Sequence, residues 1–252
     1  MQTRADADAE SGYLANACER LRAILDPSLI GVYAGGSWAL GDYLPGRSDL
    51  DVAVVVRESL SPELGKAAVA RLRHESLPCP ARCLELVVYR LDTARSGSAG
   101  ADFELNLNTG GDTPLLVQSN GASRDAGAHW FAIDRSVLAQ AGIALLGPPA
   151  NEVFAPIPLA ALAPVVAESV RWHRDHPVEP GDAVLNACRA LRFADEGCWS
   201  SKPAAGRWAV GRGLAPPNLV TRACRARAEP VSLDPEEVAA FLGAVESRLR
   251  SA

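Results

Sequence analysis

The spacing of apolar residues in the first half of the chain alternates between helical and strand periods. Apolar residues recur every three or four positions from Tyr13 to Leu25, which predicts an amphipathic helix. The apolar run at 29–33 predicts a short buried strand that ends at Gly35. Similar patterns predict further strands at 50–56, 83–90 and 102–109, and a helix near 61–76.

The pattern changes after the proline-rich segment "LLGPPANEVFAPIP" at 145–158, which interrupts any periodic element. Strand patterns fade beyond it and helical ones follow, separated by proline and glycine. These helices are predicted near 159–173, 181–196, 205–212, 218–228 and 235–250. We therefore expect an α+β protein, with a mixed α/β domain over residues 1–150 and a helical bundle domain over residues 151–252.

Composition is consistent with a protein that folds around its own core. With 252 residues, of which 48% are hydrophobic, the chain can bury enough apolar surface without metals or disulfides. Its cysteines are scattered and lack the paired spacing of a zinc site, so we predict reduced, mostly packing thiols. They are Cys18, Cys79, Cys83, Cys188, Cys198 and Cys224.

Charge and hydropathy limit the classes of partner. The net charge is −5, and no cluster of lysine and arginine suggests a nucleic-acid surface. The acidic first half favours a cationic small molecule. The start of the chain has no apolar segment typical of a signal peptide, and no stretch is long enough to span a membrane, so a cytoplasmic protein is expected. Oligomeric state stays open.

A glycine-serine turn follows the first predicted strand. Gly35, Gly36 and Ser37 allow a tight turn with exposed N–H groups, and a helix that begins there would add its positive end. Such a turn can bind phosphate oxygens. It can also serve chain geometry alone.

Two aspartates begin the next strand. Asp49 and Asp51 lie two positions apart and therefore point to the same face, whereas Leu50 points into the core. Two close carboxylates repel each other unless a cation lies between them, and Mg²⁺ prefers this oxygen environment. The alternative is a solvated strand end without a metal.

A third carboxylate lies within the apolar strand "CLELVVYR". Glu85 is flanked by Leu84 and Leu86, and a glutamate inside an apolar strand is rarely buried without a partner. If this strand pairs with the strand at 50–56, Glu85 can face the aspartates. Three carboxylates beside a phosphate-binding turn indicate phosphoryl or nucleotidyl transfer.

These residues resemble the signature of the polymerase β-like nucleotidyltransferase superfamily, a Gly-Ser pair followed by Asp-x-Asp and a later acidic residue. Within it, the chain resembles the aminoglycoside adenylyltransferases that modify streptomycin and spectinomycin. The resemblance implies that Asp49 and Asp51 hold Mg²⁺ and that Gly36 and Ser37 contact the triphosphate of ATP. It also implies that Glu85 is the general base for a drug hydroxyl, with pyrophosphate released.

The same resemblance extends into the second half. "LNACRALRFADEGCWSSKP" resembles the segment that brings an arginine and, thirteen residues later, a lysine to the ATP phosphates, here Arg189 and Lys202. Trp172 and Asp182 match positions that line the drug pocket, and the cleft between the domains is the implied active site. The segment 102–111 lacks the second pocket tryptophan of the streptomycin enzymes, which leaves the drug open. We expect His129 and Trp130 to be structural.

Two other functions remain open from the sequence. One is adenylyl transfer to a hydroxyl of a protein, an RNA or another small molecule. The other is a module that binds nucleotide without catalysis, although such a module need not keep Glu85.

Overall fold

The computed structural model describes residues 4–119, 128–176 and 179–251. Contacts between residues divide the chain into two compact units. The first comprises Met1–Arg124 with Asp134–Pro156, and the second comprises Asp125–Ile133 with Ile157–Ala252. The predicted class is confirmed, because one unit is built on a mixed sheet and the other is helical. The division into domains at residues 1–150 and 151–252 stays a prediction.

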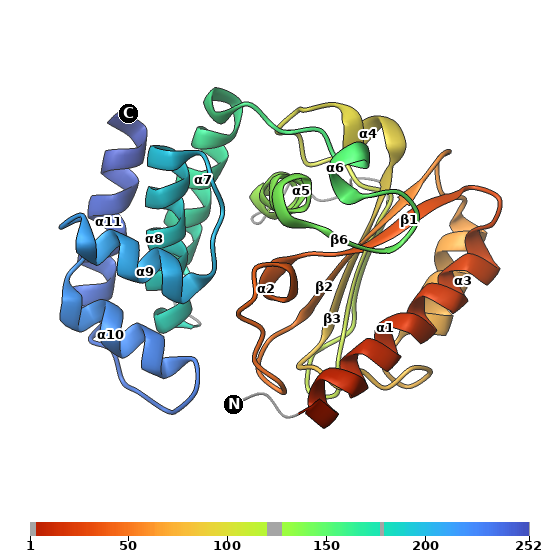
Figure 1. Ribbon diagram of the computed structural model, residues 1–252, viewed down its shortest axis with the longest axis horizontal. Helices are drawn as coiled ribbons and strands as arrows, with labels where there is room; N and C mark the ends of the chain where they lie inside the picture. The colour runs from red at the N-terminus through yellow and green to blue at the C-terminus, as the bar shows by residue number, and fades with distance from the viewer. Residues whose placement is uncertain (1–3, 120–127, 177–178, 252) are drawn as a thin grey trace. The chain divides into compact units, whose positions relative to one another are not determined.

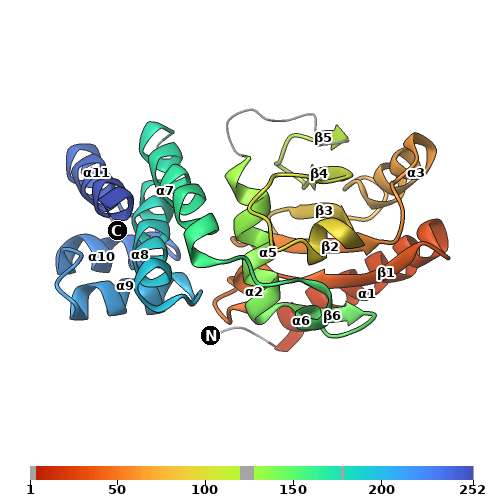
Figure 2. The same cartoon turned by 90° about the horizontal axis from the view of Figure 1, so that it is seen from above.

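A six-stranded mixed sheet forms the first unit. Its strands run in the order β5-β4-β3-β2-β1-β6 (Figure 2). Among the strands that the structure describes, only β2 and β3 pair in parallel, and helix α3 (Pro62–Leu72) provides the crossover that a parallel pair requires. The strands are β1 (Leu29–Ala34), β2 (Leu50–Val56), β3 (Leu84–Arg90), β4 (Leu105–Thr109), β5 (Leu116–Ser119) and β6 (Ile143–Leu146).

The two faces of this sheet carry different side chains. Leu50, Val52 and Val54 of β2 belong to the main core, where helices α1 (Arg4–Leu25) and α3 cover the sheet (Figure 1). Their neighbours at alternate positions, Asp51 and Ala53, therefore point to the opposite face. The predicted separation of Leu50 from the aspartates is confirmed.

Several short elements were not predicted from the sequence. Strands β5 and β6 have only four residues each and lie at the edges of the sheet. Their side chains are exposed or half-buried, so the sequence shows no apolar alternation there. Helices α2 (Gly36–Ala39), α4 (Leu91–Arg95) and α6 (Ala150–Val153) are single turns. Helix α5 (His129–Ala141) was also missed, and its residues divide between the two units after Ile133.

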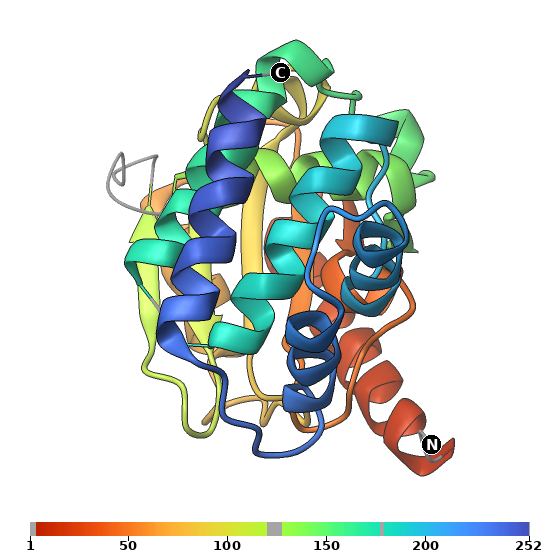
Figure 3. The ribbon, with the colours of Figure 1, turned by 90° about the vertical axis from the view of Figure 1, so that its left-hand side faces the viewer.

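The second unit is a bundle in which α8 is central. Helix α8 (Pro180–Glu196) packs against the other four helices, and nine of its residues are buried (Figure 3). Gly181 allows α8 to approach α10, because a Cβ there would lie 2.9 Å from the Cβ of Ala226. The other helices are α7 (Leu159–Asp175), α9 (Lys202–Gly211), α10 (Pro217–Ala226) and α11 (Pro235–Ser251).

Helix α9 begins earlier than its apolar spacing predicts. The Ser201 side chain accepts a hydrogen bond of 3.3 Å from the Ala204 N–H, and Pro203 lies in the first turn, where a missing N–H is tolerated. Lys202 is thereby fixed at the first residue of a helix rather than in a loop.

None of the helices in the described ranges is long and apolar enough to cross a membrane. All six cysteines lie within those ranges and are free thiols.

Candidate active site

The parallel pairing of β2 and β3 brings the predicted carboxylates together. Asp51 lies directly opposite Glu85 in the strand register, so both side chains extend from the same face of the sheet. Asp49, one residue before β2, joins them: one ligand atom each from Asp49, Cys83 and Glu85 lie within 4.8 Å of one another. Cys83 was predicted only as a packing thiol.

The environment of Glu85 favours its protonated form. Burial raises the pKa of Glu85 well above its usual value, and the negative charges of Asp51, Asp49 and Asp134 add to the effect. Asp134 lies on α5 and had no signal in the sequence. Positive charge next to these carboxylates would favour the ionised form of Glu85, which can accept a proton.

The donor atoms fit a hard divalent cation such as Mg²⁺. Asp49, Asp51 and Glu85 offer carboxylate oxygens, which Mg²⁺ prefers. Burial and a hydrogen bond to Asp49 raise the pKa of the Cys83 thiol, so in the metal-free protein its sulfur is protonated and donates to Asp49.

Arg82 contacts Asp49 and was missed by sequence reasoning. Its Nε donates to Asp49 Oδ1 at 2.8 Å and its Nη2 to Asp49 Oδ2 at 2.5 Å, the two-pronged geometry that arginine makes with a carboxylate. Arginines near surface strands are common, so the sequence offered no signal for this contact.

The glycine turn lies against Asp51. The Gly35 N–H donates to the Asp51 carbonyl oxygen at 2.9 Å, and Gly36 has a φ of +47°. A Cβ on Gly36 would lie 1.7 Å from Asp51 Oδ2, so only glycine fits this position. Ser37 follows in the single turn of α2 and is half-buried.

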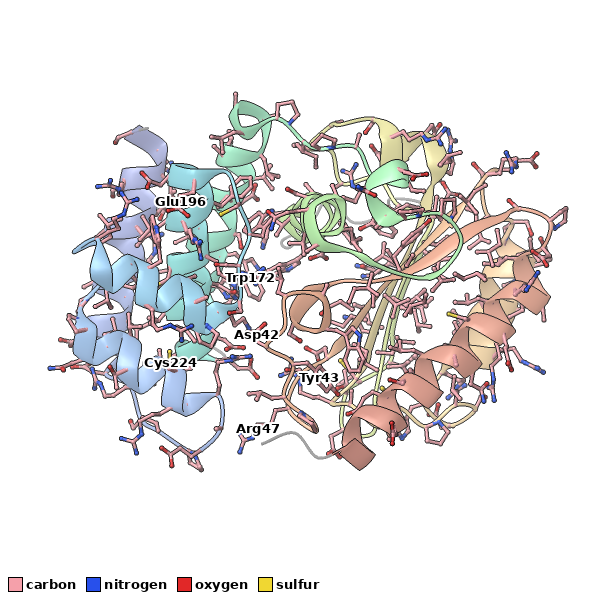
Figure 4. All side chains as sticks on the ribbon, viewed as in Figure 1. Asp42, Tyr43, Arg47, Trp172, Glu196 and Cys224 are labelled. Atoms are coloured by element: carbon pink, nitrogen blue, oxygen red, sulfur yellow. The ribbon has the colours of Figure 1, made fainter. Side chains whose placement is uncertain are left out.

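The loop after α2 is tied to helix α1. Tyr43, labelled in Figure 4, donates its hydroxyl to Glu10 Oε1 of α1 at 2.9 Å, and its ring packs edge-on against Trp38. Both Glu10 and Tyr43 are buried. The turn that carries Ser37 is therefore held to the main core by a buried polar contact.

In the second unit, two residues predicted to meet different ligands contact each other. Lys202 Nζ lies 2.6 Å from Asp182 Oδ2, which joins the first turns of α9 and α8. Arg227, next to the end of α10, lies 4.0 Å from the other oxygen of Asp182. Arg189 is placed by stacking its guanidinium 5.5 Å from the centre of the Trp199 ring.

Trp172 belongs to a cluster of aromatic rings, here called the Trp172 cluster: His129, Trp130, Trp172, His173 and His176. Trp172, labelled on α7 in Figure 4, meets the Trp130 ring edge-on at 5.5 Å and stacks on His176 at 4.7 Å. His173 lies 3.1 Å from Asn186, which also accepts a long hydrogen bond from Arg189. Trp130 thus contacts a residue that the resemblance places in the drug pocket.

His129 is the most buried member of the Trp172 cluster, with 2% of its surface exposed. Neither ring nitrogen has a hydrogen-bond partner among the described residues. Burial, followed by the charges of His173 and Arg171, lowers the pKa of His129 to about 4. Burial also lowers the pKa of His173 to about 4, and the charge of Lys202 contributes. Both rings are therefore neutral at pH 7.

The residues predicted to form the site lie in two groups, one in each unit. The first unit brings together Gly36, Asp49, Asp51 and Glu85, with Ser37 next to them. In the second unit, Asp182 and Lys202 are paired. Trp172 contacts His173, which connects through Asn186 to Arg189.

Both halves of the chain match known families. Residues 16–91 match the nucleotidyltransferase domain, and residues 152–245 match the aminoglycoside adenylyltransferase C-terminal domain. No curated protein matches the sequence. Among solved structures, spectinomycin adenyltransferase AAD(9) from Enterococcus faecialis, crystallised with ATP and spectinomycin, has a similar fold. Its TM-score is 0.72 at 19% identity, covering 95% of this chain and 98% of that one.

His129 generates a prediction for pH-dependent stability. The unfolded chain binds a proton at this histidine near pH 6.5, but the folded protein does so only near pH 4. The free energy of unfolding should therefore fall as the pH drops from about 6.5 towards 4, by roughly 2 kcal/mol between pH 7 and pH 5 from this residue.

Urea unfolding at pH 7 and pH 5 measures this difference. His129→Phe and His129→Gln both remove the titrating group but differ in packing, so each should reduce the pH dependence by a similar amount. A pH dependence that is unchanged in both variants would show that His129 is not the source.

Proposed function

Because this chain is an aminoglycoside adenylyltransferase-like nucleotidyltransferase, we propose that it transfers AMP from ATP to a hydroxyl group of streptomycin or spectinomycin and releases pyrophosphate. The observation that carries the proposal is the register of β2 and β3. It places Asp51 opposite Glu85, beside a glycine turn that a side chain would block. The AAD(9) enzyme of similar fold was crystallised with ATP and spectinomycin, which supports the same class of substrate.

Asp49 and Asp51 are the residues that would hold Mg²⁺ in this reaction. When bound, the metal supplies positive charge against the negative charge that develops on the phosphate oxygens. Gly36 keeps the turn close to Asp51, and Ser37 offers its hydroxyl and backbone N–H to a phosphate group. These residues bind and orient the nucleotide.

Glu85 is the proposed proton acceptor. A hydroxyl attacking the α-phosphorus loses its proton, and a carboxylate with a raised pKa is a stronger base than an ordinary glutamate. The pairing of Asp51 with Glu85 across β2 and β3 fixes where this carboxylate lies.

The second unit is proposed to contribute phosphate and drug contacts. Arg189 and Lys202 carry the positive charges for the triphosphate, and Trp172 offers a half-buried ring to a cationic drug. Asp182 is the proposed carboxylate partner for a drug ammonium group. Asp182 also pairs with Lys202. Binding of the triphosphate to Lys202 therefore changes the charge next to Asp182, and binding of the drug to Asp182 changes the charge next to Lys202.

Product analysis tests the reaction. The protein is incubated with ATP, MgCl₂ and, separately, streptomycin, spectinomycin and other aminoglycosides, and the drugs are analysed by mass spectrometry for an added adenylyl group. Reactions with no acceptor, with bulk RNA and with unrelated protein serve as controls. Adenylylated RNA or protein with every drug unmodified would overturn the proposal in favour of a macromolecular substrate.

Replacing Glu85 by glutamine should separate binding from chemistry. Glu85→Gln keeps the shape of the side chain, so Mg·ATP affinity should stay close to that of the wild type. Turnover should fall by roughly 10²–10⁴, the usual contribution of a positioned base. Steady-state kinetics and calorimetry with Mg·ATP measure the two effects, with the exposed Glu58→Gln as control. A loss of Mg·ATP binding in a folded Glu85→Gln protein would instead identify a metal ligand.

A methyl group at Gly36 should disable the site. In Gly36→Ala the new Cβ would overlap Asp51 Oδ2, and the carboxylate must move. A displacement of about 1 Å can lower turnover about 10²-fold. Gly12→Ala is a matched control, because its Cβ would meet nothing within 4 Å. Pyrophosphate release measures both variants, and near wild-type turnover in Gly36→Ala would contradict the proposed role of the turn.

A further inference from the structure

The backbone fixes Arg82 beside Asp49. Leu50 N–H donates to the Cys83 carbonyl oxygen at 2.9 Å, and Arg82 N–H donates to the Ser48 carbonyl oxygen at 3.2 Å. The parallel pairing of β2 and β3 thus continues one step beyond the strands on the side of the carboxylates. Arg82 is held next to Asp49 by this pairing, whatever its side chain contacts.

The side-chain contacts occupy both oxygens of Asp49. Oδ1 accepts from Arg82 Nε at 2.8 Å and from the Cys83 thiol at 2.9 Å, and Oδ2 accepts from Arg82 Nη2 at 2.5 Å. The Asp49 side chain is 17% exposed, whereas that of Arg82 is 44% exposed. The carboxylate is therefore enclosed, and the guanidinium closes it from the solvent side.

The charge of Arg82 offsets part of the repulsion among the carboxylates. Its positive charge lowers the pKa of Glu85, opposing the charges of Asp51 and Asp49, which raise it. A cation is thus already present at the carboxylates when no metal is bound. A divalent ion that binds Asp49 must displace the guanidinium or lie next to it, and like charges repel.

We propose that Arg82 is a latch: it holds Asp49 when no nucleotide is bound and yields the carboxylate to a divalent cation that arrives with ATP. The proposal rests on the metal-binding role of Asp49 in the proposed function. Arg82 is a positioning residue in this scheme, because it acts through Asp49 and not on the reacting atoms.

The sign of the charges explains the dependence on nucleotide. A bare divalent ion adds two positive charges beside the guanidinium, so binding is opposed. The complex of the same ion with ATP carries net negative charge, which attracts the guanidinium away from Asp49. Removal of Arg82 should therefore favour the bare ion and give no comparable gain for the nucleotide complex.

Binding of Mn²⁺ alone tests the latch. The free ion is measured by electron paramagnetic resonance in titrations of wild-type protein, Arg82→Ala and Arg82→Gln, first without nucleotide and then with ATP. Without nucleotide, both variants should bind Mn²⁺ about tenfold more tightly than the wild type, since charge-assisted hydrogen bonds are removed from a ligand. With ATP, the variants should show no such gain.

Thermal unfolding provides a second measurement that does not depend on activity. Without metal, Arg82→Ala and Arg82→Gln should melt at a lower temperature than the wild type, because the carboxylates lose their counter-ion. Added Mn²⁺ should raise the melting temperature of the variants more than that of the wild type. Arg73→Ala is the matched control: Arg73 is 43% exposed and pairs with Glu75 away from the carboxylates.

The outcomes separate the latch from the proposed function. If Arg82→Ala and Arg82→Gln bind Mn²⁺ alone no more tightly than the wild type, or if Arg73→Ala shows the same gain, the latch is wrong. Absence of adenylylated drug with intact wild-type protein would instead overturn the proposed function, and the Mn²⁺ titrations would still decide whether Arg82 controls Asp49.

Discussion

Repulsion among the carboxylates on one face of the sheet is the constraint on which the site depends. The parallel register of β2 and β3 places the Asp51 and Glu85 side chains next to each other. Leu50, Val52 and Val54 pack in the main core on the other face of the sheet and so fix this register. A one-residue slip would turn the leucine and valines towards the carboxylate face. The apolar core therefore maintains an arrangement of charges that would not persist by itself.

The sequence was sufficient for the parts of the site that follow from strand geometry. Alternation along β2 predicted the separation of Leu50 from Asp49 and Asp51. The isolated Glu85 indicated a buried partner, and the pairing of the two strands was the condition for its facing the aspartates. Arg82, Cys83 and Asp134 could not be found in this way. Arg82 and Cys83 act through the path of the chain into β3, and Asp134 acts through the position of α5. The spacing of apolar residues along the sequence predicts neither feature.

The same distinction holds in the helical unit. Helical periods predicted the elements, and the resemblance selected Arg189, Lys202, Trp172 and Asp182. The pairing of Asp182 with Lys202 depends on the start of α9, which Ser201 sets by capping and which the apolar spacing placed three residues later. The contact between the Trp130 and Trp172 rings, 42 positions apart in the chain, also has no local signal, and the structural role of Trp130 stays a prediction.

The need for glycine at position 36 also determines which base changes in its codon alter the site. All four glycine codons share their first two bases, so every substitution at either base replaces this residue, while every change at the third base is silent. Any replacement would place a Cβ against Asp51, whatever amino acid it carries. A change at either of the first two bases therefore disturbs the Asp51 carboxylate, and a change at the third base leaves it untouched.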